Sequence, residues 1–486
     1  MLAIGGMAIS LKETKWPRRT ERGNEMNRRE LLSKAGATGA LMAGAGAALK
    51  TDLVSAATGV ESSKLFVPPD RLAPATFDRL PLSWHKERFR TLQGRLEQAG
   101  YDGVFLTDQW NIIYFTGLFH TNTERPFYAF IPTQGEHPVW FFPALDRDLV
   151  HSWWYEDGQM YFDYPNVAGA MPNEGEVVKG PKQDLWRWAF QGLKRRGFGE
   201  KRLAADKEFV PSLQRIVVEE LTKPMESAAD HCLYLRMRKT PEELALTRRA
   251  YAYFDRMHAF ARDLLLTKGT DLTDYEIGAA TTKFGVDMIM ADIKHDGTPN
   301  TTVGITVDVT CRAGKITGYP HPNQFLYNKV SKGQALQVEG VVRIGGCGGE
   351  LYRPFMIAPR TPHMQKIWTV NRDCCLMQKD LSRKGTECAD VAYPIHEFQV
   401  KQGVQKWIYH RPAHGEGMEG HQPPYLALGD HTVLDTGMCF SVEPGLFDPE
   451  NGIGSNFSDL FVVEPTGPSL GMSRVPYNEE WMWISL

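Results

Sequence analysis

The sequence predicts two folded domains, the first of the α/β class, from three observations. The chain has 486 residues, 42% of them hydrophobic and 23% charged, which is enough apolar material for more than one core. Helical and strand-like patterns alternate between about residues 83 and 232. A strong helix start at Thr240 then opens a new segment. We therefore expect an N-terminal domain over residues 83–235 and a second domain over residues 236–470.

A targeting segment is expected before the first domain. The twin-arginine run from Asn27 to Leu32 precedes a weakly apolar, Ala- and Gly-rich stretch from Ala35 to Leu49, and the small residues from Val54 to Ala57 follow. Twin arginines, an apolar stretch and a cleavage-like site in this order are typical of a twin-arginine export signal. The alternative is a flexible Ala- and Gly-rich tail.

The signal fixes two further boundaries. Met26 lies two residues before the arginine pair, so residues 1–25 are interpreted as a possible misassigned upstream start and residues 26–57 as the signal peptide. The mature protein would begin near Thr58, and we expect it in the periplasm.

A linker precedes the elements of the first domain. Residues 58–82 are rich in Pro and Ala over much of their length and are expected to form this linker. Residues 83–99 are predicted to form a helix because apolar side chains recur at intervals of three and four. Buried strands are predicted at 103–106, 127–131 and 138–142.

The second domain is predicted to begin with a long helix. Thr240 is the expected N-cap, Pro241 takes the first helical position, and Glu243 completes a capping box. The helix is expected to run to about Leu266. His258 lies on its apolar stripe, which favours a core histidine over a metal ligand.

Composition excludes some classes of function and narrows others. The net charge of -3 provides no basic surface for nucleic acid. No apolar run reaches 18 residues, so stable membrane insertion is not expected. Seven cysteines are odd in number and lack paired spacing, so we expect neither a disulfide framework nor a CxxC metal site.

Six short segments occur in a recognisable order along residues 83–470. They are Asn111–Gly117, Arg236–Glu243, Gly269–Ile277, Gly318–His321, Ala413–Pro423 and Glu443–Gly445. Together they resemble the creatinase, aminopeptidase P, prolidase and methionine aminopeptidase superfamily. The resemblance implies an α/β N-terminal domain followed by an α+β pita-bread catalytic domain, and a homodimer. It leaves residues 471–486 as a separate C-terminal tail.

The resemblance also implies a metal site from which this chain departs. Metallopeptidases of this fold hold two ions through two aspartates, one histidine and two glutamates. The aspartate positions carry Glu339 and Glu350, and the histidine and first glutamate are His414 and Glu443. Ser458 stands where the last glutamate belongs. Because a bridging carboxylate is replaced by a hydroxyl, we expect no intact dinuclear site.

Metal-free chemistry of the creatinase kind is the preferred expectation, with no cofactor. By resemblance, His321 would move a proton between water and the leaving nitrogen. His414 and His421 would polarise the carbonyl or position water, while Glu350 and Glu443 orient them.

Two points remain open at this site. Glu339 is expected to act as base or nucleophile, since a carboxylate among other carboxylates has a raised pKa. The alternative is a single Mn, Fe, Co or Zn ion bound by Glu339, Glu350, His414 and Glu443.

Three residues are predicted to bind substrate. Arg353 follows the second acidic position and is expected to pair with the carboxylate of Glu339 or Glu350. Arg411, three residues before His414, could bind a substrate carboxylate, and Tyr425 could form a wall of the pocket.

The sequence therefore predicts an exported hydrolase of a C–N bond in a small molecule or short peptide, without an essential metal. The first alternative is a mononuclear, metal-dependent Xaa-Pro-type peptidase. A lyase of the same fold and a non-catalytic binding protein are further alternatives.

Overall fold

The computed structural model describes residues 60–68, 72–121, 123–165, 179–294, 304–321 and 327–486. The expected upstream start and signal peptide lie outside these residues. The described residues all belong to one compact unit, Ala56–Leu486. None of the helices in the described ranges is long and apolar enough to cross a membrane.

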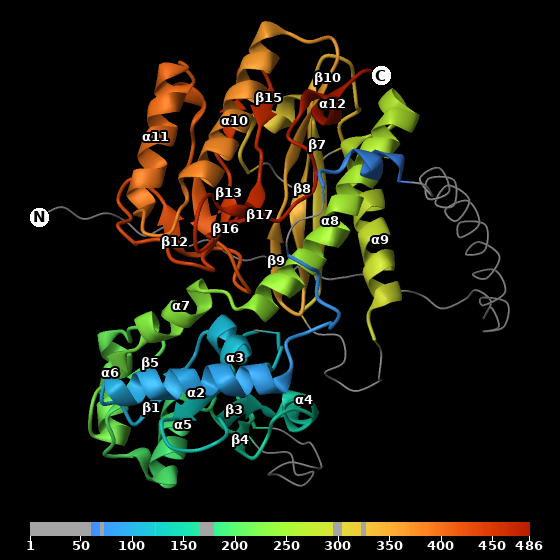
Figure 1. Cartoon of the computed structure of the whole chain (residues 1–486). Coiled ribbons are helices and arrows are strands. Elements are labelled where there is room, and N and C mark those ends of the chain that lie inside the picture. The colour runs from blue at the N-terminus through green and yellow to red at the C-terminus, as the bar shows by residue number, and fades with distance from the viewer. Residues whose placement is uncertain (1–59, 69–71, 122, 166–178, 295–303, 322–326) are drawn as a thin grey trace, which may run out of the picture. The chain divides into compact units, whose positions relative to one another are not determined.

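A six-stranded mixed sheet forms the first part of the fold (Figure 1). Its order is β4-β3-β2-β1-β5-β6, with β1 antiparallel to β2 and parallel to β5. The strands are β1 (Gly103–Leu106), β2 (Tyr128–Pro132), β3 (Val139–Pro143), β4 (Asp157–Tyr161), β5 (Leu203–Ala205) and β6 (Glu226–Ser227). The three predicted strands are confirmed to within one residue.

Helices accompany this sheet, as expected for the α/β class. The predicted helix at 83–99 is confirmed as α2 (Leu82–Gln98), and Gly100 follows it with a φ of 77°, a conformation that glycine adopts without strain. The other helices are α3 (Gln109–Thr116), α4 (Arg147–His151), α5 (Leu185–Leu193), α6 (Pro211–Leu221) and α7 (Ala229–Met237).

The long helix predicted at Thr240 is confirmed as α8 (Pro241–Lys268). Thr240 Oγ1 accepts a hydrogen bond from the backbone N–H of Glu243, and the Glu243 carboxylate accepts one from the backbone N–H of Thr240, which completes the capping box. His258 is buried in this helix and its Nε2 lies 3.0 Å from the carbonyl oxygen of Leu351. The prediction of a core histidine is therefore confirmed.

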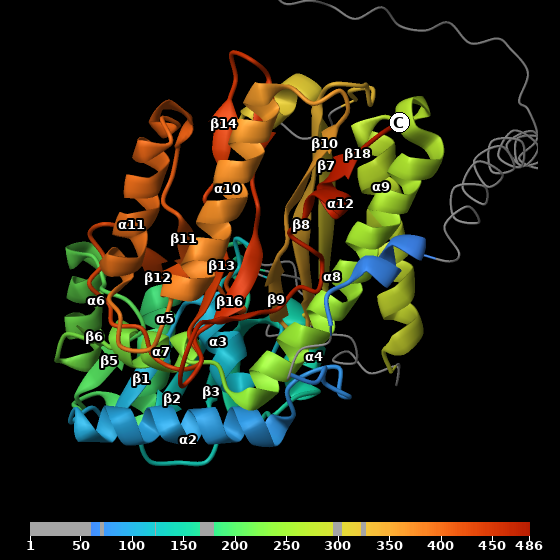
Figure 2. The ribbon, with the colours of Figure 1, turned by 45° about the horizontal axis from the view of Figure 1, so that its top comes forward.

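Helices α8 and α9 (Asp274–Asp292) pack on a five-stranded sheet (Figures 1 and 2). Its order is β18-β10-β8-β7, and β9 pairs with β8. The strands are β7 (Thr306–Ala313), β8 (Ala335–Ile344), β9 (Cys347–Glu350), β10 (Arg353–Ile357) and β18 (Trp483–Ile484).

A second five-stranded sheet has the order β12-β11-β13-β16-β17, and a two-stranded sheet pairs β14 with β15. The strands are β11 (Ala413–Gly415), β12 (Gln422–Leu426), β13 (Cys439–Val442), β14 (Leu446–Asp448), β15 (Ile453–Ser455), β16 (Asp459–Val462) and β17 (Leu470–Gly471). Helix α10 (Pro362–Leu381) contacts β15, and α11 (Cys388–Lys401) contacts β12. Strands and helices of this part are segregated as expected for an α+β domain.

Two terminal segments are more ordered than the sequence indicated. Ser62, in the expected linker, donates its hydroxyl to Asp263 of α8 at 2.5 Å. At the other end, α12 (Glu479–Met482) leads into β18, which pairs in parallel with β10. Residues 471–486, predicted as a C-terminal tail, thus contribute a strand to the five-stranded sheet, and Trp481 is fully buried.

Candidate active site

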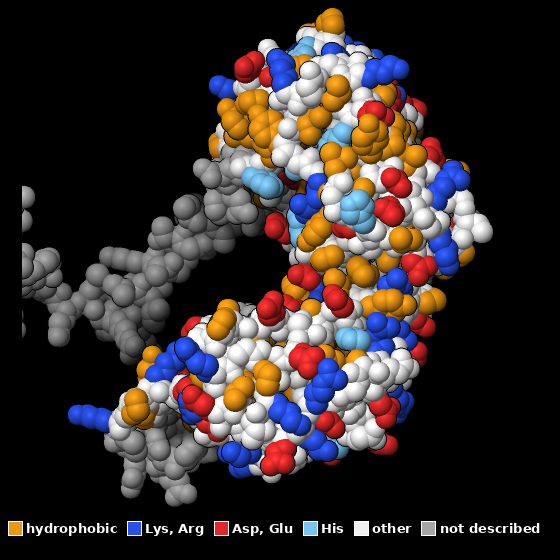
Figure 3. All heavy atoms as spheres, turned by 90° about the vertical axis from the view of Figure 1, so that its left-hand side faces the viewer, with side chains coloured by type: hydrophobic (Ala, Val, Ile, Leu, Met, Phe, Trp, Pro, Cys, Tyr) orange, Lys and Arg blue, Asp and Glu red, His pale blue; other side chains and the backbone are white. Residues whose placement is uncertain are grey.

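Four side chains predicted for the site come from neighbouring strands. Glu350 ends β9, His414 is the middle residue of β11, His421 immediately precedes β12, and Glu443 follows β13. Strand β11 lies between β12 and β13, so one sheet brings His414 close to His421 and Glu443, whereas Glu350 reaches them from β9 of the other five-stranded sheet. On the surface shown in Figure 3, histidine and acidic side chains are both visible.

His414 lies between two carboxylates. Its Nε2 is 3.4 Å from Oε2 of Glu443 and 3.7 Å from Oε2 of Glu350. Its Nδ1 is 3.1 Å from the carbonyl oxygen of Gly415, and because a carbonyl can only accept, Nδ1 carries a hydrogen. Nε2 is buried and has no hydrogen-bond partner among the described residues. Because Nε2 and the carboxylate oxygens all present lone pairs, a cation, either a proton or a metal ion, is needed between them.

The charges of the site shift several pKa values. Burial disfavours the charged form of His414, but Glu350 and Glu443 outweigh it and raise the pKa of His414 to about 11. Burial alone would raise the pKa of Glu350, yet His414, His421 and Ser441 lower it below the ordinary value. Without a metal, the two neighbouring carboxylates therefore favour the imidazolium form of His414.

His421 forms the exposed edge of the site. Its side chain is 60% exposed, whereas that of His414 is 3% exposed. Its Nε2 lies 3.8 Å from Oε1 of Glu350. A ligand arriving from solvent can therefore reach His421 before His414.

Ser441 is a site residue that sequence reasoning missed. Its hydroxyl donates to Oε2 of Glu350 at 3.1 Å and lies 3.3 Å from the hydroxyl of Ser458. Ser458 is thus beside the site, in a buried position. Ser441 pairs with His414 across β13 and β11, so only the strand register could have found it.

Glu443 also has a partner that was not predicted. Asn456 Nδ2 donates to Oε1 of Glu443 at 3.4 Å. Asn456 is buried two residues before Ser458, and its Oδ1 has no hydrogen-bond partner among the described residues. Its position two residues before Ser458, which was compared with a metal ligand of the superfamily, was the available signal.

Glu339 is held apart from the other ligand atoms. The group of His and carboxylate ligand atoms within 4.8 Å of one another consists of Glu350, His414 and His421. Glu339 instead forms an ion pair with Arg312. The structure therefore provides a different set of possible metal ligands from the predicted Glu339, Glu350, His414 and Glu443.

His321 is exposed at the end of a described segment, and residues 322–326 lie outside the described part. Within the described residues no hydrogen bond or ion pair joins it to His414, His421 or Glu350. Its role as a proton shuttle stays a prediction.

The three predicted substrate-binding residues have different fates. Arg353 is fully buried and pairs with Asp459 at 3.1 Å, not with Glu339 or Glu350, so the predicted pairing is wrong. Its position in β10 turns the side chain into the protein interior, where it cannot meet a substrate. Arg411 is exposed, and its guanidinium lies 4.3 Å from the ring centroid of half-buried Tyr425. These two residues remain available to a ligand.

One divalent ion fits this chemistry. Imidazole nitrogens and carboxylate oxygens are the ligands that Mn, Fe, Co and Zn accept in proteins. His414 Nε2 is free of a hydrogen bond and its Nδ1 is oriented by a backbone carbonyl, as in metal-ligating histidines. Glu350, His414 and Glu443 could hold the ion, and His421 lies beside them at the exposed edge of the site.

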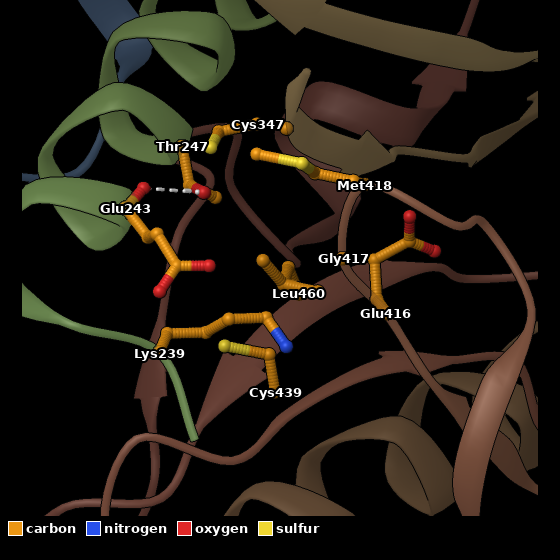
Figure 4. A pocket seen from close by; sticks show the side chains of 10 residues that line it. Lys239, Glu243, Thr247, Cys347, Glu416, Gly417, Met418, Cys439 and Leu460 are labelled. Atoms are coloured by element: carbon orange, nitrogen blue, oxygen red, sulfur yellow. Dashed lines mark hydrogen bonds between the residues drawn. The ribbon is translucent and has the colours of Figure 1, made fainter. Parts of the chain in front are cut away.

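A second buried acidic group lies next to the site. Glu416 pairs with Arg343, and burial raises the pKa of Glu416 to about 8 despite this partner. A cavity of about 10 Å³, the size of one water molecule, separates Glu416 from Lys239 and Glu243 at the start of α8 (Figure 4). These residues form a polar layer between α8 and the segment that carries His414.

Comparisons with known proteins identify families that match both parts of the chain. Residues 245–465 match the model of metallopeptidase family M24, and residues 88–216 match that of the creatinase/prolidase N-terminal domain. The chain is 25% identical to an Xaa-Pro dipeptidase of Lactobacillus delbrueckii subsp. lactis over 74% of this chain and 89% of that protein. It is 22% identical to a creatinase of Bacillus sp. strain B-0618 over 87% of this chain and 98% of that one.

Solved structures share the fold. The dipeptidase PepE of Mycobacterium ulcerans superposes with a TM-score of 0.66 and 20% identity, covering 84% of this chain and all of that one.

Proposed function

Because the chain belongs to the creatinase and prolidase superfamily, we propose that it is a hydrolase of the C–N bond in short peptides, of the Xaa-Pro dipeptidase type, with one divalent metal ion. The observation that carries the proposal is the position of His414 Nε2. It is buried, faces Glu350 and Glu443, and has no hydrogen-bond partner among the described residues. A divalent cation satisfies all three groups at once.

One ion, rather than two, is favoured by two features of the chain. Ser458 offers a hydroxyl where a second bridging carboxylate would be needed. Glu339 is already paired with a buried cation, Arg312. Both features reduce the negative charge available to a second ion.

The residues of the chain divide the work of such a reaction. A bound ion would supply Lewis acidity to the scissile carbonyl. Glu350, Glu443 and His414 would hold the ion, while the exposed His421 is placed to accept or donate a proton at the substrate. Arg411, supported by the ring of Tyr425, would bind the carboxylate of a short peptide.

A second candidate function is metal-free hydrolysis of a small amide. The raised pKa of His414 favours it, because a proton on Nε2 would compensate Glu350 and Glu443 as an ion would. Unlike the first candidate function, this one requires no metal ion.

Metal content and turnover distinguish the two. We would count the ions in the purified protein, remove them with a chelator, and assay a panel of Xaa-Pro dipeptides before and after adding Mn²⁺, Co²⁺ or Zn²⁺. About one ion per chain and restored turnover support the proposal. Turnover that is unchanged by the chelator contradicts the proposed requirement for a metal ion and favours the second candidate.

The matched variants are His414→Ala and His431→Ala. His431 is an exposed histidine that pairs with Glu387 outside the site. We expect only His414→Ala to lose the ion and turnover. Absence of turnover across both substrate classes, with ligands still raising the melting temperature, would favour a binding protein.

Two further properties are part of this proposal. The twin-arginine pattern supports export, with the mature chain beginning near Thr58. N-terminal sequencing of the protein from a periplasmic fraction tests this, and an intact Met26 start would contradict it. A homodimer is proposed from the superfamily resemblance, and light scattering measures its mass.

A further inference from the structure

A buried arginine, Arg312, forms an ion pair with Glu339, one of the acidic residues predicted as metal ligands. Its side chain is 4% exposed, and its Nη2 pairs with Oε2 of Glu339. The two residues come from adjacent antiparallel strands, β7 and β8. The proposed reaction assigns no role to Arg312.

The other arm of the guanidinium holds the segment before His321. Arg312 Nη1 donates to the carbonyl oxygen of Tyr319 at 2.7 Å and to that of Pro320 at 3.2 Å. These are the two residues directly before His321. One planar group therefore ties β8 to the turn that carries the predicted proton shuttle.

Glu339 has three hydrogen-bond donors in this arrangement. Besides Arg312, its Oε2 accepts from Gln337 Nε2 at 2.9 Å and its Oε1 from Thr310 Oγ1 at 3.4 Å. Oε2 is therefore already bound by two donors, and the charge of Arg312 compensates the negative charge that would attract an ion.

Glu339 nevertheless lies close to the site. Val341, two residues along β8 and on the same face, pairs with Glu350 of β9. Diagonal neighbours of this kind are about 7–8 Å apart in antiparallel sheets. The charge on Arg312 is therefore close enough to act on whatever occupies the Glu350 and His414 group.

We propose that Arg312 is a positioning residue that takes the place of a metal cation at Glu339 and holds the His321 turn through the carbonyls of Tyr319 and Pro320. The inference deepens the proposed function and rests on it for the identity of the site. Its electrostatic consequence has a definite sign. A fixed positive charge beside the site opposes a divalent ion, so removing it strengthens metal binding while it weakens catalysis.

The experiment compares Arg312→Met with the wild type in three measurements. They are the Mn²⁺ dissociation constant of chelator-treated protein by calorimetry, kcat/KM, and hydrogen–deuterium exchange of the peptide covering residues 314–321. In Arg312→Met we expect Mn²⁺ to bind at least tenfold more tightly, kcat/KM to fall at least tenfold, and that peptide to exchange faster. Arg312→Lys keeps the charge but not the planar fork, so it should change exchange and leave Mn²⁺ affinity near the wild-type value.

Two controls separate positioning from loss of folding. Arg238→Met removes an arginine that pairs with half-buried Asp435 away from the site, and should change none of the three quantities. The double variant Arg312→Met with Glu339→Leu removes both charges, so its Mn²⁺ affinity should return to within threefold of the wild type.

The outcomes decide each claim separately. Weaker or unchanged Mn²⁺ binding in Arg312→Met overturns the charge role, and unchanged exchange overturns the positioning role. If the wild type binds no Mn²⁺ and hydrolyses no dipeptide, the proposed function is wrong, but this result does not contradict the role of Arg312. In that case Mn²⁺ binding gained in Arg312→Met still supports the charge role of Arg312, and its absence overturns it.

Discussion

The imidazole rings of His414 and His421 are stacked, with 3.8 Å between centroids and 14° between planes. Two positive rings in this position would repel each other. Burial and the charge of His414 both lower the pKa of His421. A metal ion on His414 would act in the same direction. The stacking therefore favours a positive charge on the buried ring of His414 and a neutral ring of His421 at the surface.

This stacking predicts the acid limb of the pH profile. If neutral His421 accepts a proton at the substrate, activity falls as pH drops through its lowered pKa, so the limb of kcat/KM should lie below the ordinary histidine value of about 6.5. His421→Asn should remove this limb, and His431→Asn should keep it. A limb above pH 7 in the wild type would contradict the assignment.

Arg353 should matter for stability and not for catalysis. It is fully buried against Asp459, and removing one partner leaves an unpaired buried charge, which costs about 3–5 kcal/mol. Chemical denaturation of Arg353→Met measures this loss. The double variant Arg353→Met with Asp459→Leu should recover much of it. A raised KM with unchanged unfolding would restore Arg353 as a substrate-binding residue.

Glu243 predicts a pH dependence of folding with a definite sign. Burial raises its pKa from 4.5 to about 7, so the folded protein binds the proton more tightly than the unfolded chain. The contribution is fully present below pH 4.5 and is lost as pH rises to about 7. This rise of the pKa from 4.5 to about 7 corresponds to about 3 kcal/mol.

Glu243→Gln isolates this effect, because glutamine also completes a capping box. Between pH 4.5 and pH 8, the unfolding free energy of the wild type should fall by about 3 kcal/mol more than that of the variant. Equal pH dependence of the two proteins would show that Glu243 is ionised in the fold.

The cysteines should be unreactive in the native protein. All seven are free and buried, and burial raises the pKa of, for example, Cys374, Cys375 and Cys439. A thiol reagent at pH 8 should modify none of them within the time that modifies the exposed position of a Val433→Cys variant, and should modify seven in denaturant. Rapid modification of the native wild type would contradict this burial.

Local signals predicted the parts of the fold that depend on local chemistry. The capping box at Thr240 and the glycine after α2 lie within a few residues of the helix ends that they specify. Four of the six predicted catalytic residues also came together, namely Glu350, His414, His421 and Glu443, whereas Glu339 pairs with Arg312.

Partners that depend on register could not be predicted. Ser441 meets Glu350 across strands, and Arg312 meets Glu339 from a strand whose sequence alone does not tell which residue lies opposite. Arg353 was assigned to the wrong carboxylate because Asp459 is distant in sequence and adjacent in space. Strand β18 has two residues, too few to show a periodicity.

Strand β18 has a consequence for the time at which the molecule is completed. All strands of the six-stranded sheet have left the ribosome once residue 227 has emerged, so that sheet can form on the nascent chain. The sheet that carries Glu339 also needs Trp483 and Ile484, which are synthesised after every other strand of that sheet. Until these residues emerge, the edge beside β10 stays open, so this sheet is completed later than the six-stranded sheet.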